Sequence, residues 1–115
     1  MVTLGPAAIV VIPLPFSDLS GTKLRPAVVM ADAGRGDWLL CQVTSNPYSD
    51  PGAIRITGED LQKGALTSEV SFARPIKLFT ANESVMVKQV AILKSETFKT
   101  LITSTIEALR KNMPK

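Results

Sequence analysis

The chain has 115 residues, a net charge of +3 and an isoelectric point near 9.2. This length suits one domain with a real hydrophobic core, so we expect a single domain over residues 1–115. No apolar run approaches the roughly 20 residues of a membrane helix, and the N-terminus lacks the pattern of a signal peptide. We therefore expect a cytoplasmic protein without a membrane partner.

The sequence contains no histidine and only one cysteine, Cys41, which lies inside an apolar run. Histidine is the commonest acid–base residue and, with cysteine, a main ligand of zinc. The composition therefore argues against a metal site and against histidine chemistry, and we expect no cofactor. A mildly basic chain is compatible with a polyanionic partner.

The first half of the chain predicts strands separated by polar and proline-rich loops. Residues 9–12 predict a buried strand that ends at residues 13–16, because each proline removes a hydrogen-bond donor. The next strand follows a polar loop and should hold Arg25 extended, since that residue precedes Pro26. Further strands in this half are predicted at residues 23–31, 38–44 and 53–56, with a hairpin connection at 32–37.

The second half predicts short strands followed by a helix. Residues 59–63 are typical of one helical turn that stops at Gly64, and Ser95 suits the N-cap of the last helix. Extended segments are predicted at residues 70–73, 76–80, 84–87 and 90–93, the last as a short strand or a turn. Apolar positions at helical spacing are Phe98, Leu101, Ile102, Thr105, Ile106 and Leu109.

Six or seven short strands and one terminal helix indicate a mainly β (α+β) fold. We predict a small, strongly curved antiparallel sheet or open barrel. The helix should pack its apolar stripe on this sheet or on a second subunit.

Two polar groups are predicted to meet at one end of the sheet. Arg25 enters one strand, and Thr44 and Ser45 end its hairpin neighbour. A guanidinium fork and two hydroxyls could bind one phosphate. From the residues alone, a solvated charge at Arg25 and turn chemistry at Thr44, Ser45 and Asn46 are the commoner interpretations.

Three blocks of the sequence resemble the MazF/PemK toxin family: residues 13–30, PLPFSDLSGTKLRPAVVM; residues 41–50, CQVTSNPYSD; and residues 73–80, ARPIKLFT. With residues 9–12 in front, the resemblance covers nearly the whole chain. Members are toxins of type II toxin–antitoxin systems. The resemblance implies an SH3-like barrel, a homodimer, a cognate antitoxin and metal-independent, sequence-selective cleavage of single-stranded RNA, chiefly mRNA.

The same resemblance implies roles for single residues. Arg25, Thr44 and Ser45 match the family's catalytic positions, where a ribose 2′-hydroxyl attacks the adjacent phosphate to leave a 2′,3′-cyclic phosphate and a 5′-hydroxyl. We expect the loops at residues 17–23 and 47–52 to flank this site. RNA-binding residues are expected at Lys23, Ser20, Asn46, Arg74 and Lys77. For Arg74 and Lys77, a structural role or a plain surface charge stays open as the alternative.

One departure from the family pattern leaves an alternative open. Ala7 and Ala8 stand where the family usually has glycine and an acidic residue before the first strand. If the acidic residue orients the arginine or the substrate, activity would be reduced. The alternative is a non-catalytic or degenerate module on the same fold, which binds an antitoxin or acts like a gyrase poison.

Overall fold

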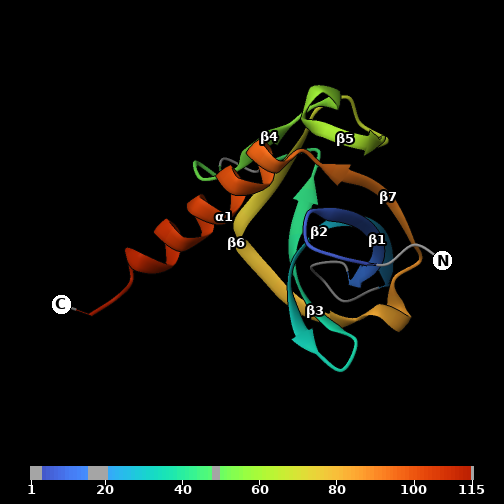
Figure 1. Ribbon diagram of the computed structural model, residues 1–115, viewed down its shortest axis with the longest axis horizontal. Helices are drawn as coiled ribbons and strands as arrows, with labels where there is room; N and C mark the ends of the chain where they lie inside the picture. Colours follow the sequence, from blue (N-terminus) through green and yellow to red (C-terminus); the bar gives the residue numbers. More distant parts are fainter. Residues whose placement is uncertain (1–3, 16–20, 48–49, 115) are drawn as a thin grey trace.

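The fold is a seven-stranded antiparallel sheet with one α-helix, in a computed structural model that describes residues 4–15, 21–47 and 50–114 (Figure 1). The strand order is β4-β6-β3-β2-β1-β7-β5. In chain order the elements are β1 (Ala8–Pro15), β2 (Thr22–Gly34), β3 (Asp37–Thr44), β4 (Ile54–Ile56), a 3₁₀ turn (Gly58–Asp60), β5 (Leu61–Gly64), β6 (Ser71–Asn82), a second 3₁₀ turn (Glu83–Val85), β7 (Lys88–Leu93) and α1 (Ser95–Arg110).

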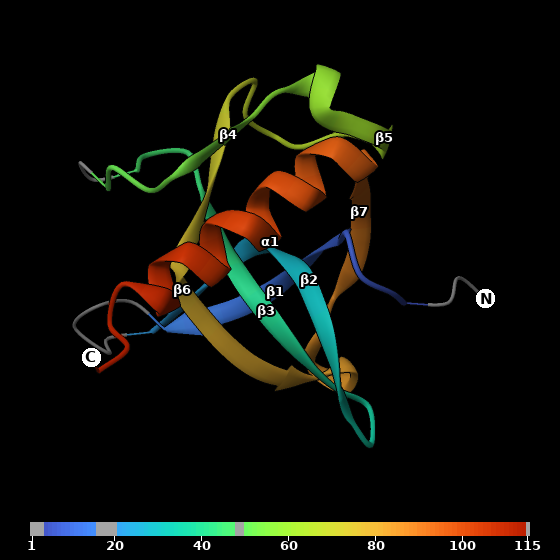
Figure 2. The same ribbon diagram turned by 60° about the vertical axis from the view of Figure 1, so that its left-hand side comes forward.

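The sheet curls into a nearly closed barrel. Its two edge strands, β4 and β5, are joined only by the short turn Gly58–Asp60, so they lie near one another although they are at opposite ends of the strand order. Figures 1 and 2 show this β4–β5 segment folding over one side of the barrel. The predicted small open barrel with a C-terminal helix is confirmed.

The β2–β3 hairpin is confirmed, with a tighter turn than predicted. Strand β2 runs on to Gly34, and only Arg35 and Gly36 separate it from β3. Both residues have positive φ angles, 56° and 81°. Positive φ at both central residues is typical of a type I′ turn, whose twist matches that of the flanking strands.

Alternating side chains build a core on each face of the sheet. In β1, Ile9 joins one apolar cluster, whereas Val10 and Ile12 join the other. Helix α1 packs on the first cluster through the fully buried Leu101. The fully buried side chains include Ile9, Ile12, Leu40, Ile56, Leu93, Leu101 and Cys41.

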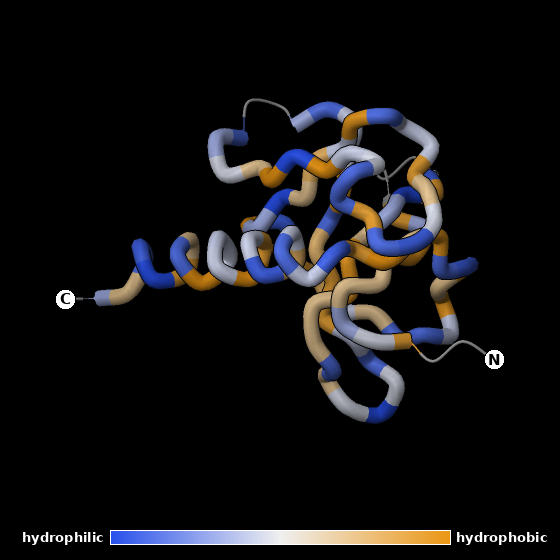
Figure 3. Tube along the Cα trace, turned by 45° about the horizontal axis from the view of Figure 1, so that its top comes forward, coloured by the Kyte–Doolittle hydropathy of each residue, from blue (hydrophilic) through white to orange (hydrophobic). Residues whose placement is uncertain are grey.

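The predicted helical stripe is buried only as far as Thr105, which is 8% exposed. Phe98 and Ile102 contact the core beside Leu101. Ile106 and Leu109 are 46% and 63% exposed. Figure 3 shows the C-terminal part of the helix extending away from the barrel, with apolar segments along it.

Strand β1 corrects the expectation that residues 13–16 end regular pairing. It pairs with β2 through both Pro13 and Pro15. The carbonyl of Val11 accepts a hydrogen bond from the N–H of Val87, so Val11 directs its backbone toward β7. Because the backbone direction alternates along a strand, the nitrogens of Pro13 and Pro15 also point toward the β7 side. Both prolines lie beyond Val11, the last residue of β1 that pairs with β7, so their missing N–H groups remove no hydrogen bond from either ladder. Phe16 lies outside the described residues.

The predicted helical turn at residues 59–63 is wrong in its second half. The turn ends at Asp60, whose carboxylate accepts hydrogen bonds from the N–H of Thr57 and the hydroxyl of Thr97. From Leu61 the chain then pairs with β7 as strand β5.

Two further boundaries differ from the prediction. Residues 84–87 do not form a strand, because the Asn82 side chain accepts the N–H of Ser84 and caps the turn Glu83–Val85. Ser95 is the first helical residue, and Lys94 stands at the N-cap without a side-chain cap bond. The segments predicted at residues 70–73 and 76–80 belong to one strand, β6, which begins at Ser71.

Gly64 is required where β5 crosses close to β7. Its φ is +84°, and an added Cβ would press on the Val90 carbonyl and lie 2.7 Å from the Cα of Ala91. We expect Gly64→Ala to lower the free energy of unfolding by about 3 kcal/mol or more, from left-handed strain plus a backbone clash. Thermal unfolding monitored by circular dichroism measures this effect.

Gly58→Ala is the matched control for this substitution. Nothing lies within 4 Å of the Cβ position of Gly58, and its φ is not in the left-handed region. Its effect should stay within about 1 kcal/mol. Equal melting temperatures for the two variants would contradict the proposed close approach.

Candidate functional site

The β2–β3 hairpin brings Arg25 and Thr44 to the same end of the sheet. The last pair of this ladder at that end is Ala27 with Gln42. Continuing the register by two residues places Arg25 opposite Thr44, on the same face as Ala27 and Gln42. Arg25 is half-buried in β2, where it pairs with Ile12 of β1.

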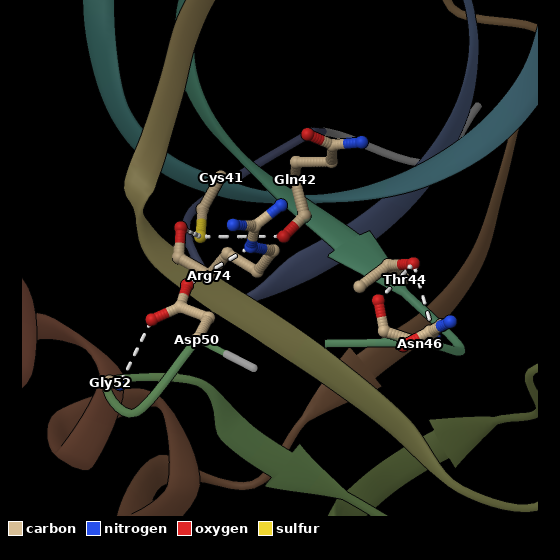
Figure 4. A network of polar contacts seen from close by, with 7 residues as sticks. All are labelled: Cys41, Gln42, Thr44, Asn46, Asp50, Gly52 and Arg74. Atoms are coloured by element: carbon tan, nitrogen blue, oxygen red, sulfur yellow. Dashed lines mark hydrogen bonds and ion pairs between the residues drawn. The ribbon is translucent and has the colours of Figure 1, made fainter. Parts of the chain in front are cut away.

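Thr44 is turned into the loop that follows β3. It is 4% exposed. Its hydroxyl donates to the carbonyl of Asn46 at 3.1 Å and accepts the N–H of Asn46 at 3.2 Å. These two bonds, visible in Figure 4, fix the bend at Ser45, whose side chain is exposed.

A cleft of about 440 Å³ lies beside this end of the sheet. Its ionisable lining residues are Lys23, Arg25 and Lys88, and no carboxylate is among the described residues that line it. Three cations without a counter-charge favour an anionic ligand. The remaining lining residues are Val11, Leu24, Pro26, Ser45, Ala65, Leu66, Thr67, Ser68, Ser71 and Val90.

Arg74 is held by an ion pair with the loop before β4. Its Nε lies 3.0 Å from Oδ2 of Asp50, and the two side chains are only 15% and 5% exposed. The hydrogen bond from Arg74 lowers the pKa of Asp50 below its ordinary value, against the effect of burial and with help from the N–H of Gly52. Asp50 and Arg74 therefore form a fixed charged pair (Figure 4).

The strand segment around Arg74 leaves the ladder locally. Cys41 pairs with Leu78 and Val43 with Ala73, so four residues of β6 lie opposite Gln42 alone. The thiol of Cys41 donates to the carbonyl of Arg74 at 3.1 Å. Burial raises the pKa of Cys41 to about 12, so this thiol is a protonated core group, as its apolar surroundings in the sequence predict.

The predicted site residues fall into three sets. Lys23, Arg25 and Ser45 line one cleft, and Thr44 and Asn46 form the bend beside it. Arg74 and Lys77 lie in the bulged part of β6 and do not line that cleft. Ser20 and most of the loop at residues 17–23 lie outside the described residues, as do residues 48 and 49 of the second predicted loop.

Sequence reasoning missed three contributions to the cleft: Lys88, Ser71 and the segment of residues 65–68. Lys88 arrives through the pairing of β7 with β1, and residues 65–68 follow β5, which was not predicted as a strand. These pairings join residues that are far apart in the chain, so no local sequence pattern predicts them.

The Ala7–Ala8 pair occupies a constrained corner at the start of β1. Ala7 has a φ of 78°, a conformation that favours glycine. Its N–H donates to the carbonyl of Val29, and its carbonyl accepts the N–H of Leu93, each at 2.9 Å. Ala8 is 3% exposed and packs in an apolar cluster with Val10.

Within residues 4–15, 21–47 and 50–114, no three or more Cys, Asp or Glu side chains are grouped so that they could hold a metal ion. No helix in this part of the chain has the length and apolar character needed to cross a membrane.

Comparison with known proteins places the fold. No family model matches the sequence, and no curated protein sequence matches it. Among solved structures, a mycobacterial endoribonuclease in complex with its cognate antitoxin superposes with a TM-score of 0.71 at 12% identity, over 97% of this chain and 100% of that one. A MazE–MazF structure from Deinococcus radiodurans gives 0.69 at 15% identity, over 91% and 94% of the two chains.

The Mycobacterium tuberculosis toxin MazF-mt6 gives a TM-score of 0.68 at 13% identity, over 90% of this chain and 96% of that chain. At these identities the likeness establishes the fold. The chain therefore has the fold of the MazF toxins, as its sequence blocks predicted.

The Asp50–Arg74 ion pair makes the free energy of unfolding depend on pH. Because the pKa of Asp50 is lowered on folding, its contribution is present above the unfolded value of about 3.9 and is lost as pH falls through the folded value. We expect Asp50→Asn to cost about 1–3 kcal/mol at pH 7 and to flatten the fall in stability below pH 4. Urea unfolding between about pH 7 and pH 3 measures both effects.

Glu59→Gln is the control, because Glu59 is an exposed carboxylate. This variant should keep the wild-type stability and its acid dependence. An Asp50→Asn variant with an unchanged pH profile would show that the ion pair does not contribute.

Proposed function

We propose that this protein is the toxin of a type II toxin–antitoxin pair and cleaves single-stranded RNA, chiefly mRNA, without a metal ion. One observation carries the proposal: Arg25 and Ser45 line the same cleft, and the charged residues among its described lining are all cationic. The fold shared with MazF toxins supports it, since those neighbours include endoribonucleases and complexes with an antitoxin.

The proposed reaction is a transfer within the RNA strand. The ribose 2′-hydroxyl attacks the adjacent phosphorus, the bond to the 5′-oxygen breaks, and the 2′-proton is lost as the leaving oxygen gains one. The products are a 2′,3′-cyclic phosphate and a 5′-hydroxyl. The step requires stabilisation of the extra negative charge on the phosphorane, which preorganised donors supply.

Arg25 is proposed as the main donor to that charge. Its planar guanidinium can donate two parallel hydrogen bonds to the non-bridging oxygens. The exposed hydroxyl of Ser45 adds a donor at the bend. Thr44 positions this bend through its two bonds to Asn46 and so fixes where the phosphate sits.

The remaining predicted RNA-binding residues differ in how free they are to bind. Lys23 lines the cleft and is exposed, so we propose that it contacts the RNA backbone. Arg74 is occupied by Asp50, so we propose a structural role for it, whereas the exposed Lys77 is available to a phosphate. Ser20 keeps its proposed role from the resemblance alone.

Two protein partners belong to the proposal. An antitoxin with an acidic segment would compete with RNA for the cationic cleft. A second copy of the chain would cover apolar surface such as Ile106 and Leu109 on the outer half of α1. A monomeric mass at tens of micromolar, roughly where a standard interface should be occupied, would contradict the homodimer.

The alternative is a toxin-fold module that binds an antitoxin without cleaving RNA. The Ala7–Ala8 pair favours it, because Ala8 is buried among apolar side chains and supplies no charge. The two functions separate in a cleavage assay with purified protein.

We expect cleavage of a long single-stranded RNA to persist in excess EDTA. The reason is that the proposed step uses only a guanidinium and hydroxyls, and the sequence has no histidine. The product ends are identified in two ways: the new 5′-hydroxyl is phosphorylated by polynucleotide kinase without prior phosphatase treatment, and the 2′,3′-cyclic phosphate blocks ligation at the 3′ end until it is removed. Loss of cleavage in EDTA and its recovery with Mg²⁺ would contradict this chemistry.

Arg25→Ala should lower the cleavage rate at saturating RNA by about 10²–10³-fold, because it removes one preorganised donor. Arg25→Lys should not restore the rate, since an ammonium group lacks the planar fork. The control is Arg55→Ala, which removes an exposed arginine from the edge strand β4. A fully active Arg25→Ala enzyme would remove this residue from the mechanism.

A further inference from the structure

The cleft beside Arg25 extends over the opposite face of the sheet. Pro26, Val11 and Lys88 are paired in a row across β2, β1 and β7. Residues directly opposed in neighbouring strands project to the same face. Arg25 and its partner Ile12 are the pair next to Pro26 and Val11, so their side chains project to the other face of the sheet.

This register separates Lys88 from the scissile site. Two strand spacings, about 10 Å, lie between the backbones of Pro26 and Lys88. Lys88 and Arg25 also belong to opposite faces of the sheet. The two cations are therefore placed to bind different phosphates.

The rest of the cleft has the composition of a nucleotide site. Leu24, Pro26, Val11, Leu66 and Val90 supply apolar surface, and four hydroxyl residues supply donors and acceptors. A nucleotide presents the same mixture: an apolar base face, a polar base edge and an anionic phosphate. A volume of about 440 Å³ is within the range of small-ligand sites. The hydroxyl residues are Ser45, Thr67, Ser68 and Ser71.

Residues 65–68 form the wall of the cleft opposite β2, and backbone and core contacts hold this segment in place. The N–H of Ala65 donates to the carbonyl of Val90 at 3.2 Å, directly after the close crossing of Gly64 over β7. Leu66 packs against the core cluster that contains Leu93. The segment is thus held above β7, next to Lys88.

We propose that this cleft binds the nucleotide that flanks the scissile phosphate, with Lys88 on the flanking phosphate and the base between Leu66 and the Leu24–Pro26 edge. The inference rests on the proposed RNA-cleaving function and names a positioning residue for it. An acidic protein segment is the competing occupant, but the apolar walls lined by hydroxyl groups favour a base.

Binding measured without cleavage tests this proposal. The probe is a fluorescein-labelled 2′-O-methyl oligouridylate of about eight nucleotides, a length typical of such sites. Fluorescence anisotropy at several salt concentrations gives Kd and its salt dependence. We expect Lys88→Ala to raise Kd about five- to tenfold at 50 mM salt and to reduce the slope of log K against log salt by about 0.7.

Matched variants separate charge from folding. Lys88→Arg should keep the wild-type slope, and Lys99→Ala, on the exposed side of α1, should change neither quantity. Leu66→Ala should weaken binding without changing the slope. A Lys88→Ala protein with an unchanged slope, or with the same Kd as Lys99→Ala, would overturn the proposal.

Two further measurements use the same protein variants. With cleavable RNA, Lys88→Ala should raise KM and leave kcat within about twofold, unlike Arg25→Ala. Because the anisotropy assay needs no cleavage, a catalytically inert protein that still shows the Lys88 effect would refute the nuclease function alone. If poly-glutamate binding depends on Lys88 while oligonucleotide binding does not, the cleft takes a protein segment and the proposal fails.

Discussion

The ladder between β2 and β3 ends at Pro26, and the geometry of the site follows from that ending. Val11 directs its backbone toward β7, so its partner Pro26 directs its own nitrogen toward β3. Because proline has no N–H, it cannot bond to β3 at this point. The pairs between β2 and β3 stop at Ala27, while β2 continues alongside β1 to Thr22.

The consequence is that Arg25 lies in a part of β2 with a partner on one side only. Beyond the last pair, β3 bends at Ser45 and is held there by the two bonds between Thr44 and Asn46. The β2–β3 ladder is therefore absent between this part of β2 and the bend, and Arg25 and Ser45 both line the cleft there. The Arg-Pro dipeptide both supplies the cation and opens the edge beside it.

Much of this arrangement follows from local sequence signals. The glycine-punctuated turn near Arg35 predicts the hairpin, and the hairpin alone brings Arg25 to the level of Thr44. The barrel and the helix follow from short apolar runs and from the spacing of residues such as Leu101. The family resemblance added the roles of these residues, which spacing by itself left open.

The rest of the site depends on contacts that local patterns do not encode. Lys88 reaches the cleft only because β7 pairs with β1, some 77 residues earlier in the chain. The helical assignment at residues 59–63 failed because Gly64 is needed for the crossing over β7, and a glycine after polar residues equally suits a helix end. Arg74 looks like a free cation in the sequence, but its partner Asp50 lies 24 residues away.

The Ala7–Ala8 departure has separate effects on the fold and on the chemistry. The backbone at Ala7 has a positive φ and makes hydrogen bonds to Val29 and Leu93. The turn into β1 therefore forms with alanine in place of glycine, at the energetic cost of a left-handed alanine. Ala8 replaces a charge with buried apolar packing. No carboxylate stands among the described residues that line the cleft, and its ionisable lining residues are Lys23, Arg25 and Lys88. Under the proposed function, such a site would bind phosphates and would promote cleavage through charge stabilisation at Arg25 rather than through a carboxylate base.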